Sequence, residues 1–221
     1  RKYNPEYNWN LEFGYRAFTK KHNFDITFFY MKRENQQVQI STQMDENPSS
    51  YTYYTANATS GYNYGFELGE QYAINKNLIL SMNAGYLKTW VDSYKFIDPT
   101  DGIEIILGGR EGAHAPAYTF STTLDYTLPA GIGFNIEYLG KDWFYISDNS
   151  DQKTDNYTLL NASINYKFKS TSITVWGKNL TDERYIVKGF YFALEPPDWT
   201  NKFYKQWGDP VEYGLTIQFE F

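Results

Sequence analysis

"VEYGLTIQFEF" (Val211–Phe221) alternates between two kinds of side chain along its whole length. Every second residue is apolar or aromatic, and the residues between them are polar or small. Because successive side chains of a strand point to opposite faces, the stretch predicts a strand with one apolar and one polar face. Its eleven residues match the length, about 9–11 residues, that a tilted strand needs to cross a bilayer. The apolar face could meet a second protein layer or lipid, and the pattern by itself leaves both open.

The same two-residue period recurs through the rest of the chain. It is clearest in residues 9–17, 24–30, 78–86, 118–128, 132–138 and 160–168. We count about nine such strands, and no segment of comparable length has the period of an amphipathic helix. An open sheet of this kind leaves two edges unpaired, which lipid does not tolerate. We therefore expect further strands from earlier in the same protein or from a partner chain.

Composition narrows the classes of protein. With 42% hydrophobic and 20% aromatic residues, the chain of 221 residues is too apolar to stay disordered. No run approaches the roughly 18 consecutive apolar residues of a membrane helix, so any membrane span must be a β-strand. The net charge of −6 argues against nucleic-acid binding, and the absence of cysteine excludes disulfides and thiolate metal sites. The chain begins at Arg1 without a secretory signal, which we interpret as a processed or partial chain.

The connections between the predicted strands differ in length in a regular way. Short turns at 19–23, 75–77, 129–131 and 169–171 alternate with long connections at 41–56, 91–115, 142–156 and 181–209. Outer-membrane barrels have this asymmetry, and long structureless loops are uncommon in compact soluble domains. Aromatic residues gather where strands leave the apolar band, as in interfacial girdles, although aromatic residues also favour strands in general. The pattern favours a transmembrane antiparallel up-and-down β-barrel.

Several segments, taken in order, resemble the C-terminal part of TonB-dependent outer-membrane receptors. The segments are "YNPEYNWNLEFGY" (3–15), "NATSGYNYGFELGEQY" (57–72), "HAPAYTFSTTLDY" (114–126), "YTLLNASINYKF" (157–168), "ITVWGKNLTDERY" (173–185), "GFYFALEPPDW" (189–199) and "GDPVEYGLTIQFEF" (208–221). The family motif "N-L-T-D-x-x-Y" falls on Asn179, Leu180, Thr181, Asp182 and Tyr185, and the terminal Phe221 resembles the family's barrel-assembly signal. One departure is Val211, because the family often has Arg after the proline that corresponds to Pro210.

The resemblance implies a 22-stranded barrel with an N-terminal plug domain. Residues 1–221 would supply about the last nine strands, and the plug and earlier strands would lie outside this chain. It also implies uptake of a scarce ligand across the outer membrane of a Gram-negative bacterium. The expected partners are TonB, which would act through the missing N-terminal part, the plug and remaining strands, outer-membrane lipid and lipopolysaccharide, and a surface lipoprotein.

The substrate expected from the resemblance is a ferric siderophore, the commonest cargo of the family. Haem, cobalamin and oligosaccharides are alternatives, and a passive porin or a soluble glycan-binding β-protein are rival classes. No nucleophile–base pair or cofactor motif is visible, so we expect neither an enzyme nor a cofactor. The acidic residues Asp148, Asp151 and Asp155 lack the glycine and glutamate of an EF-hand, and we interpret them as a solvated loop.

Aromatic and cationic residues in the long connections are the candidates for ligand contact. They are Tyr94, Arg110, Trp143, Tyr145, Arg184, Tyr191, Trp199 and Trp207. Such residues could hold an anionic ferric chelate by charge and ring contacts, or stack on sugar rings. The alternative is that they pack loop against loop. Asn179, Thr181 and Asp182 are expected to form a structural turn by bonding backbone N–H groups.

Overall fold

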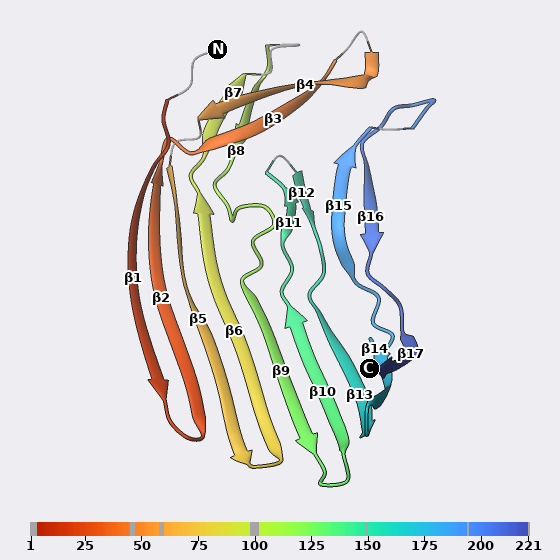
Figure 1. Ribbon diagram of the computed structural model, residues 1–221. Coiled ribbons are helices and arrows are strands. Elements are labelled where there is room, and N and C mark those ends of the chain that lie inside the picture. The colour runs from red at the N-terminus through yellow and green to blue at the C-terminus, as the bar shows by residue number, and fades with distance from the viewer. Residues whose placement is uncertain are drawn as a thin grey trace.

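A computed structural model of the chain describes residues 4–44, 47–57, 60–97, 102–148, 150–193 and 195–220. Within these residues nine antiparallel strands form one large sheet, which bends into an open curved wall (Figure 1). In sheet order they are β1 (Tyr7–Phe18), β2 (His22–Glu34), β5 (Ser60–Asn75), β6 (Leu78–Val91), β9 (Tyr118–Thr127), β10 (Ile132–Lys141), β13 (Tyr157–Phe168), β14 (Thr171–Lys178) and β17 (Glu212–Phe219). The expected all-β antiparallel architecture and strand number are confirmed.

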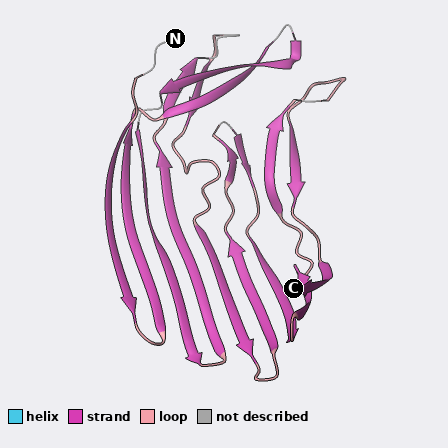
Figure 2. Ribbon diagram, in the orientation of Figure 1, coloured by secondary structure: helices cyan, strands magenta, loops and turns pink. Residues whose placement is uncertain are grey.

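Each long connection contains a hairpin in the described part of the chain. The hairpins are β3 (Gln37–Met44) with β4 (Asn47–Asn57), β7 (Tyr94–Ile97) with β8 (Glu104–Leu107), β11 (Tyr145–Ser147) with β12 (Ser150–Lys153), and β15 (Ile186–Phe192) with β16 (Lys202–Trp207). All four stand at one end of the wall, and the short turns lie at the other (Figure 2). Each long connection therefore includes a pair of strands, whereas the sequence pattern indicated loops. No helix in the described ranges is long and apolar enough to cross a membrane.

Strand register joins the apolar faces of the separate strands into one surface. Phe13, Phe28, Phe66, Tyr86 and Tyr118 are successive partners across five neighbouring strands. Large apolar side chains on this surface are exposed even on the two edge strands: Leu11 on β1 and Tyr213 on β17 are each 72% exposed. Among the described residues, no second sheet or helix covers this face. The uncovered face disagrees with a soluble sandwich and agrees with contact to lipid.

The buried core lies among the hairpins, away from the middle of the sheet. The buried hydrophobic residues among those described are Tyr94, Phe144, Ile146, Ile186 and Ala193. All of them belong to the long connections, because both faces of the main sheet are open in this chain. The hairpin end is therefore the part of the molecule that can hold side chains in a fixed arrangement.

Aromatic rings lie over glycines on neighbouring strands. Phe29 opposes Gly65, Phe120 opposes Gly140, Trp176 opposes Gly214 and Tyr213 opposes Gly177 in the strand register. A Cβ atom at each of these glycines would meet the opposing ring. An aromatic ring can pack against the backbone of the neighbouring strand where the facing residue is glycine, because glycine has no side chain in the way. Part of the chain's high aromatic and glycine content thus has a common structural cause.

Candidate functional site

Cationic and aromatic side chains meet between two of the long connections. The Trp143 and Tyr145 rings contact edge to face, with centroids 5.6 Å apart. The Arg110 guanidinium lies 4.2 Å from the centre of the Tyr145 ring. The Lys153 ammonium lies 3.9 Å from the centre of Trp143 and 4.5 Å from that of Tyr145. We call Arg110, Trp143, Tyr145 and Lys153 the aromatic–cation cluster; cations at such distances are attracted by the ring faces.

Strand alternation in β11 orients the cluster. Phe144 and Ile146 are each only 3% exposed, so their side chains anchor one face of the segment. Trp143 and Tyr145 alternate with them and therefore point to the other face. Two hydrogen bonds fasten the segment to Thr154, the residue that follows β12: the Phe144 N–H donates to Thr154 Oγ1 at 3.1 Å, and the Thr154 N–H donates to the Phe144 carbonyl at 3.0 Å.

Arg110 is already neutralised by its neighbours. It donates from Nη1 to Asp151 Oδ1 and from Nη2 to the Ser147 carbonyl, the latter at 2.9 Å. Its side chain is only 14% exposed, and it lines a narrow cleft together with Tyr94. Arg110 therefore joins the connection that follows β6 to the connection that follows β10. Its charge is committed to that contact.

The acidic residues of the third long connection have different partners. Asp151 pairs with Arg110, Asp148 accepts a hydrogen bond from the Ala113 N–H at 3.2 Å, and Asp155 is exposed. In the described segments no three His, Asp or Glu residues converge in a way that could hold a metal ion. His114 contributes its backbone N–H to the Tyr145 carbonyl at 2.9 Å, and its ring lies against Phe144.

Lys153 is the member of the cluster that sequence reasoning missed. It is exposed, and no carboxylate within the described part of the chain pairs with its ammonium. In the β11–β12 hairpin it is the direct cross-strand partner of Tyr145. Opposed residues on two strands lie side by side, so recognition of this hairpin in the sequence would have identified Lys153.

The remaining candidate residues belong to the last long connection. The Arg184 guanidinium lies 5.0 Å from the centre of the Trp207 ring, and the Lys205 ammonium lies 5.8 Å from it. Tyr191 is exposed in β15, and Trp199 follows β15 with a positive φ of 48°. Among the described residues, no ring contact or ion pair joins this group to the aromatic–cation cluster. The structure thus brings Arg110, Trp143 and Tyr145 together in one place and Arg184 and Trp207 together in another.

Asn179, in the family motif, closes the base of this last connection. It is 3% exposed, and its backbone has a positive φ of 46°. Its Nδ2 donates to the carbonyls of Glu183, at 2.9 Å, and Asp209, at 3.0 Å, while its Oδ1 accepts from the Glu183 N–H at 2.9 Å. The Asn179 N–H donates to Asn161 Oδ1 on β13 at 2.9 Å. One side chain therefore ties the end of β14 to the chain segment that leads into β17.

The other motif residues contribute unequally. The Val211 N–H donates to Asp182 Oδ1 at 3.1 Å, as expected of a turn-forming residue. The Tyr185 ring lies tilted against the Tyr157 ring, with centroids 4.3 Å apart, and the Leu180 N–H donates to the Leu160 carbonyl at 2.8 Å. Thr181 is exposed and shows no side-chain hydrogen bond within the described segments, contrary to the expectation for it. Phe221 lies outside the described residues.

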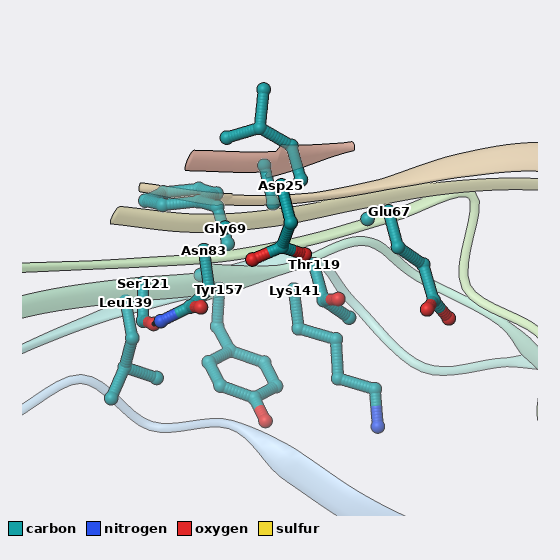
Figure 3. Close-up of a pocket in the computed structure, with 14 residues that line it drawn as sticks. Asp25, Glu67, Gly69, Asn83, Thr119, Ser121, Leu139, Lys141 and Tyr157 are labelled. Carbon is teal, nitrogen blue, oxygen red and sulfur yellow. Dashed lines mark hydrogen bonds between the residues drawn. The ribbon is translucent and has the colours of Figure 1, made fainter. Parts of the chain in front are cut away.

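An open hollow of about 600 Å³ lies on the concave face of the sheet. Its lining includes Asp25, Glu67, Gly69, Asn83, Thr119, Ser121, Leu139, Lys141 and Tyr157. Figure 3 shows the side chains of Asp25, Lys141 and Tyr157 extending from different strands toward the same side of the sheet. Lys141 also connects the hollow with the hairpins, because its ammonium lies 4.6 Å from the centre of the Phe144 ring.

Some carboxylates of the concave face accept hydrogen bonds from described residues, and others do not. Asp125 accepts from Asn135 Nδ2, and Glu137 accepts from Asn161 Nδ2, both at 2.8 Å. Asp25 and Glu67 make no hydrogen bond or ion pair with another described residue. Charged groups need partners when they are removed from water. The surface around Asp25 and Glu67 is therefore suited to contact with water or with a polar protein.

Comparisons with known proteins agree with this geometry. Residues 1–180 match the family described as "TonB dependent receptor-like, beta-barrel". In fold, the chain is similar to the ferric yersiniabactin uptake receptor FyuA from Yersinia pestis (TM-score 0.74, 16% identity, 98% of this chain and 30% of that chain). It is also similar to the copper transporter OprC (TM-score 0.72, 14% identity, 100% and 32%) and to the siderophore receptor PiuA from Acinetobacter baumannii (TM-score 0.70, 17% identity, 96% and 28%).

The chain thus spans about 30% of the length of the solved receptors that it resembles. At these identities the structural likeness shows the fold alone, whereas the family match covers most of the chain. With its single apolar face, its hairpins at one end and its short turns at the other, the chain belongs to the TonB-dependent receptor β-barrel family.

Proposed function

We propose that this chain is the C-terminal barrel portion of an outer-membrane receptor that imports a ferric siderophore in a TonB-dependent manner. The family is one of outer-membrane transport receptors of Gram-negative bacteria and not of enzymes. The observation that carries the proposal is the position of the aromatic–cation cluster at the hairpin end, above a polar hollow on the concave side of an amphipathic sheet.

The open edges of the sheet support the proposed remainder of the protein. β1 and β17 are the outer strands of the sheet and pair with each other nowhere in the described residues. Backbone groups at such edges require partners inside a bilayer. Earlier strands of a 22-stranded barrel would supply those partners, and a plug domain ahead of them would meet Asp25 and Glu67.

The chemistry of the cluster supports a chelate that carries aromatic or anionic groups. Rings of Trp143 and Tyr145 offer flat apolar contact. Lys153 offers an exposed charge that lies over both rings and forms no ion pair with a carboxylate in the described segments, although it interacts electrostatically with Glu111. Charge-assisted hydrogen bonds from such a cation are stronger than neutral ones. FyuA and PiuA are named for siderophore uptake; OprC is named for copper, so the fold does not decide the cargo.

Growth on defined nutrients tests the function of the whole protein. A strain lacking the gene is supplied in turn with a ferric siderophore, haem, cobalamin or an oligosaccharide as the only source of the limiting nutrient. We expect growth to fail on the ferric siderophore alone, and equally in a strain that lacks TonB. Unchanged uptake of every ferric chelate in the deletion strain would refute the siderophore proposal, and uptake without TonB would indicate a passive porin.

A single substitution tests the proposed contact residue. Lys153→Gln removes an exposed charge from the cluster and should weaken binding of the imported chelate about tenfold, as loss of one charge-assisted contact would. Lys95→Gln is the matched control, because Lys95 is an exposed lysine in another hairpin that pairs with Glu104. Equal affinities of the Lys153→Gln variant and the unmodified receptor would exclude Lys153 from the ligand site.

A further inference from the structure

The two ends of the wall differ in charge. The short turns that join sheet strands, at 19–21, 76–77, 128–131 and 169–170, contain four lysines and no acidic residue. We call Lys20, Lys21, Lys76 and Lys169 the basic rim. The long connections, at 35–59, 92–117, 142–156 and 179–211, contain sixteen Asp and Glu residues against seven Lys and Arg. Because the whole chain has a net charge of −6, the basic rim is a local feature and not a consequence of composition.

Three lysines of the basic rim lie on neighbouring hairpins. Strand β2 pairs with β5 down to the partners His22 and Tyr72. Just beyond that pair, the Ala73 N–H donates to the Lys21 carbonyl at 2.8 Å, so the first turn is attached to the strand that leads into the second. Lys20, Lys21 and Lys76 are all exposed, and none pairs with a carboxylate among the described residues.

Glu70, the outward-facing carboxylate near these lysines, is already hydrogen-bonded to His22. A hydrogen bond of 2.7 Å joins His22 Nδ1 and Glu70 Oε1, and the Glu70 side chain is only 11% exposed. The His22 ring stacks on Tyr72 with centroids 4.4 Å apart, which places the pair against the strand. The positive charge of the three lysines is therefore left without compensation from Glu70.

The outward face next to the basic rim is apolar and aromatic. Phe24, Tyr72 and Leu80 occupy this face near the first two turns, and Tyr126 stacks near Phe134 beside the third, with centroids 6.4 Å apart. Aromatic rings settle at the level of lipid headgroups, and aliphatic side chains meet acyl chains. Cations just beyond such rings lie where phosphate groups would be.

We propose that Lys20, Lys21 and Lys76 bind the phosphate groups of anionic phospholipids in the leaflet that faces the short turns. The contact is local, so it depends on these two hairpins and not on the rest of the barrel. The proposal rests on the membrane placement of the sheet but not on the identity of the imported ligand. Each lysine near an anionic lipid surface contributes about 1 kcal/mol, which corresponds to about a fivefold change in affinity.

Lipid association with the full-length receptor tests the proposal. The receptor is reconstituted in bilayers of zwitterionic phosphatidylcholine, and its association with spin-labelled phosphatidylglycerol is compared with that of spin-labelled phosphatidylcholine. We expect a preference for phosphatidylglycerol that falls at least fivefold in a Lys20→Gln, Lys21→Gln, Lys76→Gln triple variant. The preference should also fall as salt is added, because screening weakens exposed charges.

A triple variant at the other end of the wall is the matched control. Lys188→Gln, Lys202→Gln and Lys205→Gln remove the same number of charges from the β15–β16 hairpin and should leave the lipid preference unchanged. No preference in the unmodified receptor, or an equal loss in both triple variants, would overturn the proposal. Displacement of the labelled lipid by inorganic phosphate at constant ionic strength would also overturn it, because that result indicates a site for free phosphate.

Discussion

Gly65 shows how a single missing side chain shapes the wall. It lies on the concave face of β5, opposite Phe29, and a Cβ atom there would collide with the Tyr86 carbonyl oxygen of β6 as well as with the Phe29 ring. Backbone oxygen cannot move aside as the end of a flexible side chain can. The close approach of β5 to β6 therefore depends on the absence of a side chain at this position.

We expect Gly65→Ala to destabilise the barrel by about 1–3 kcal/mol, the usual cost of overpacking. Urea unfolding in detergent micelles measures the change. Gly133→Ala is the control, since a Cβ atom on that concave-face glycine would be 3.9 Å from its nearest contact, Asn165 Cβ. That variant should gain about 0.4–1 kcal/mol by restricting the unfolded chain. If both variants unfold at the same urea concentration, the β5–β6 approach is not a constraint.

Asn179 is the residue on which the last long connection depends most. Asn179→Ala would leave the Glu183 N–H and two backbone carbonyls without their partners and would place alanine at a positive φ. Loss of a buried hydrogen-bond network together with backbone strain should cost about 2–4 kcal/mol. Urea unfolding measures this loss of stability.

Thr181→Ala supplies the comparison within the same motif. Thr181 is exposed and has no side-chain hydrogen bond among the described residues, so its replacement should change stability by less than about 0.5 kcal/mol. A cost for Thr181→Ala equal to that of Asn179→Ala would mean that the motif acts through contacts outside this chain.

At the scale of elements, an ion pair fastens the second long connection to the wall. The Lys88 ammonium on β6 donates a hydrogen bond to Glu111 Oε1, and this bond lowers the pKa of Glu111 below its ordinary value of 4.5. A group whose pKa is lowered by folding adds stability above its ordinary pKa and loses it as the pH falls through the lowered value. The connection should therefore loosen only in acid.

Hydrogen exchange of residues 108–117 checks this pH dependence. Relative to a Glu111→Gln variant, the unmodified protein should exchange more slowly at pH 7, and the difference should disappear at a pH below the lowered pKa of Glu111. Glu104→Gln is the control, because its pair with Lys95 is more exposed and contributes little. Protection by Glu111 that grew as the pH fell would contradict the assigned ion pair.

The elements also show what could be predicted from the sequence. Period-two alternation was sufficient to predict the nine strands of the sheet, because one face of each strand is apolar over many residues. The hairpins were missed, since β11 has only three residues (Tyr145–Ser147) and its partner β12 is a polar segment (Ser150–Lys153). Segments of this length carry too few alternations to be distinguished from turns.

The candidate site was predicted less well for a related reason. Arg110 and Tyr145 were chosen as residue types suited to a ligand, but the contacts between Arg110, Asp151 and the Ser147 carbonyl join residues about forty positions apart. No local pattern encodes such a contact. Pairing of Lys153 with Tyr145 likewise depends on the register of a hairpin that the alternation did not reveal.

At the scale of the whole molecule, polarity is arranged in four zones. The convex face is apolar, the concave face is polar, the hairpin end is rich in acidic residues and the short-turn end is basic. A soluble protein would bury its apolar face, and the chain leaves that face open along every strand of the sheet. This arrangement agrees with lipid around the wall and with a polar or water-filled space inside it.

Neighbouring residues on β13 test this arrangement directly. Ile164 lies on the convex face near the middle of the strand and is 50% exposed, whereas Ser163 lies on the concave face opposite Asn135 and Trp176. Ile164→Lys should cost about 2–4 kcal/mol on folding into phospholipid vesicles, the depth-dependent cost of a lysine facing the bilayer interior. Ser163→Lys should cost far less, because its charge enters a polar, water-accessible space. Both variants introduce the same charged side chain one position apart, so the added charge is matched and the face of the sheet differs. A larger cost at Ser163 than at Ile164 would place the apolar side of the wall against protein and remove the basis for membrane insertion.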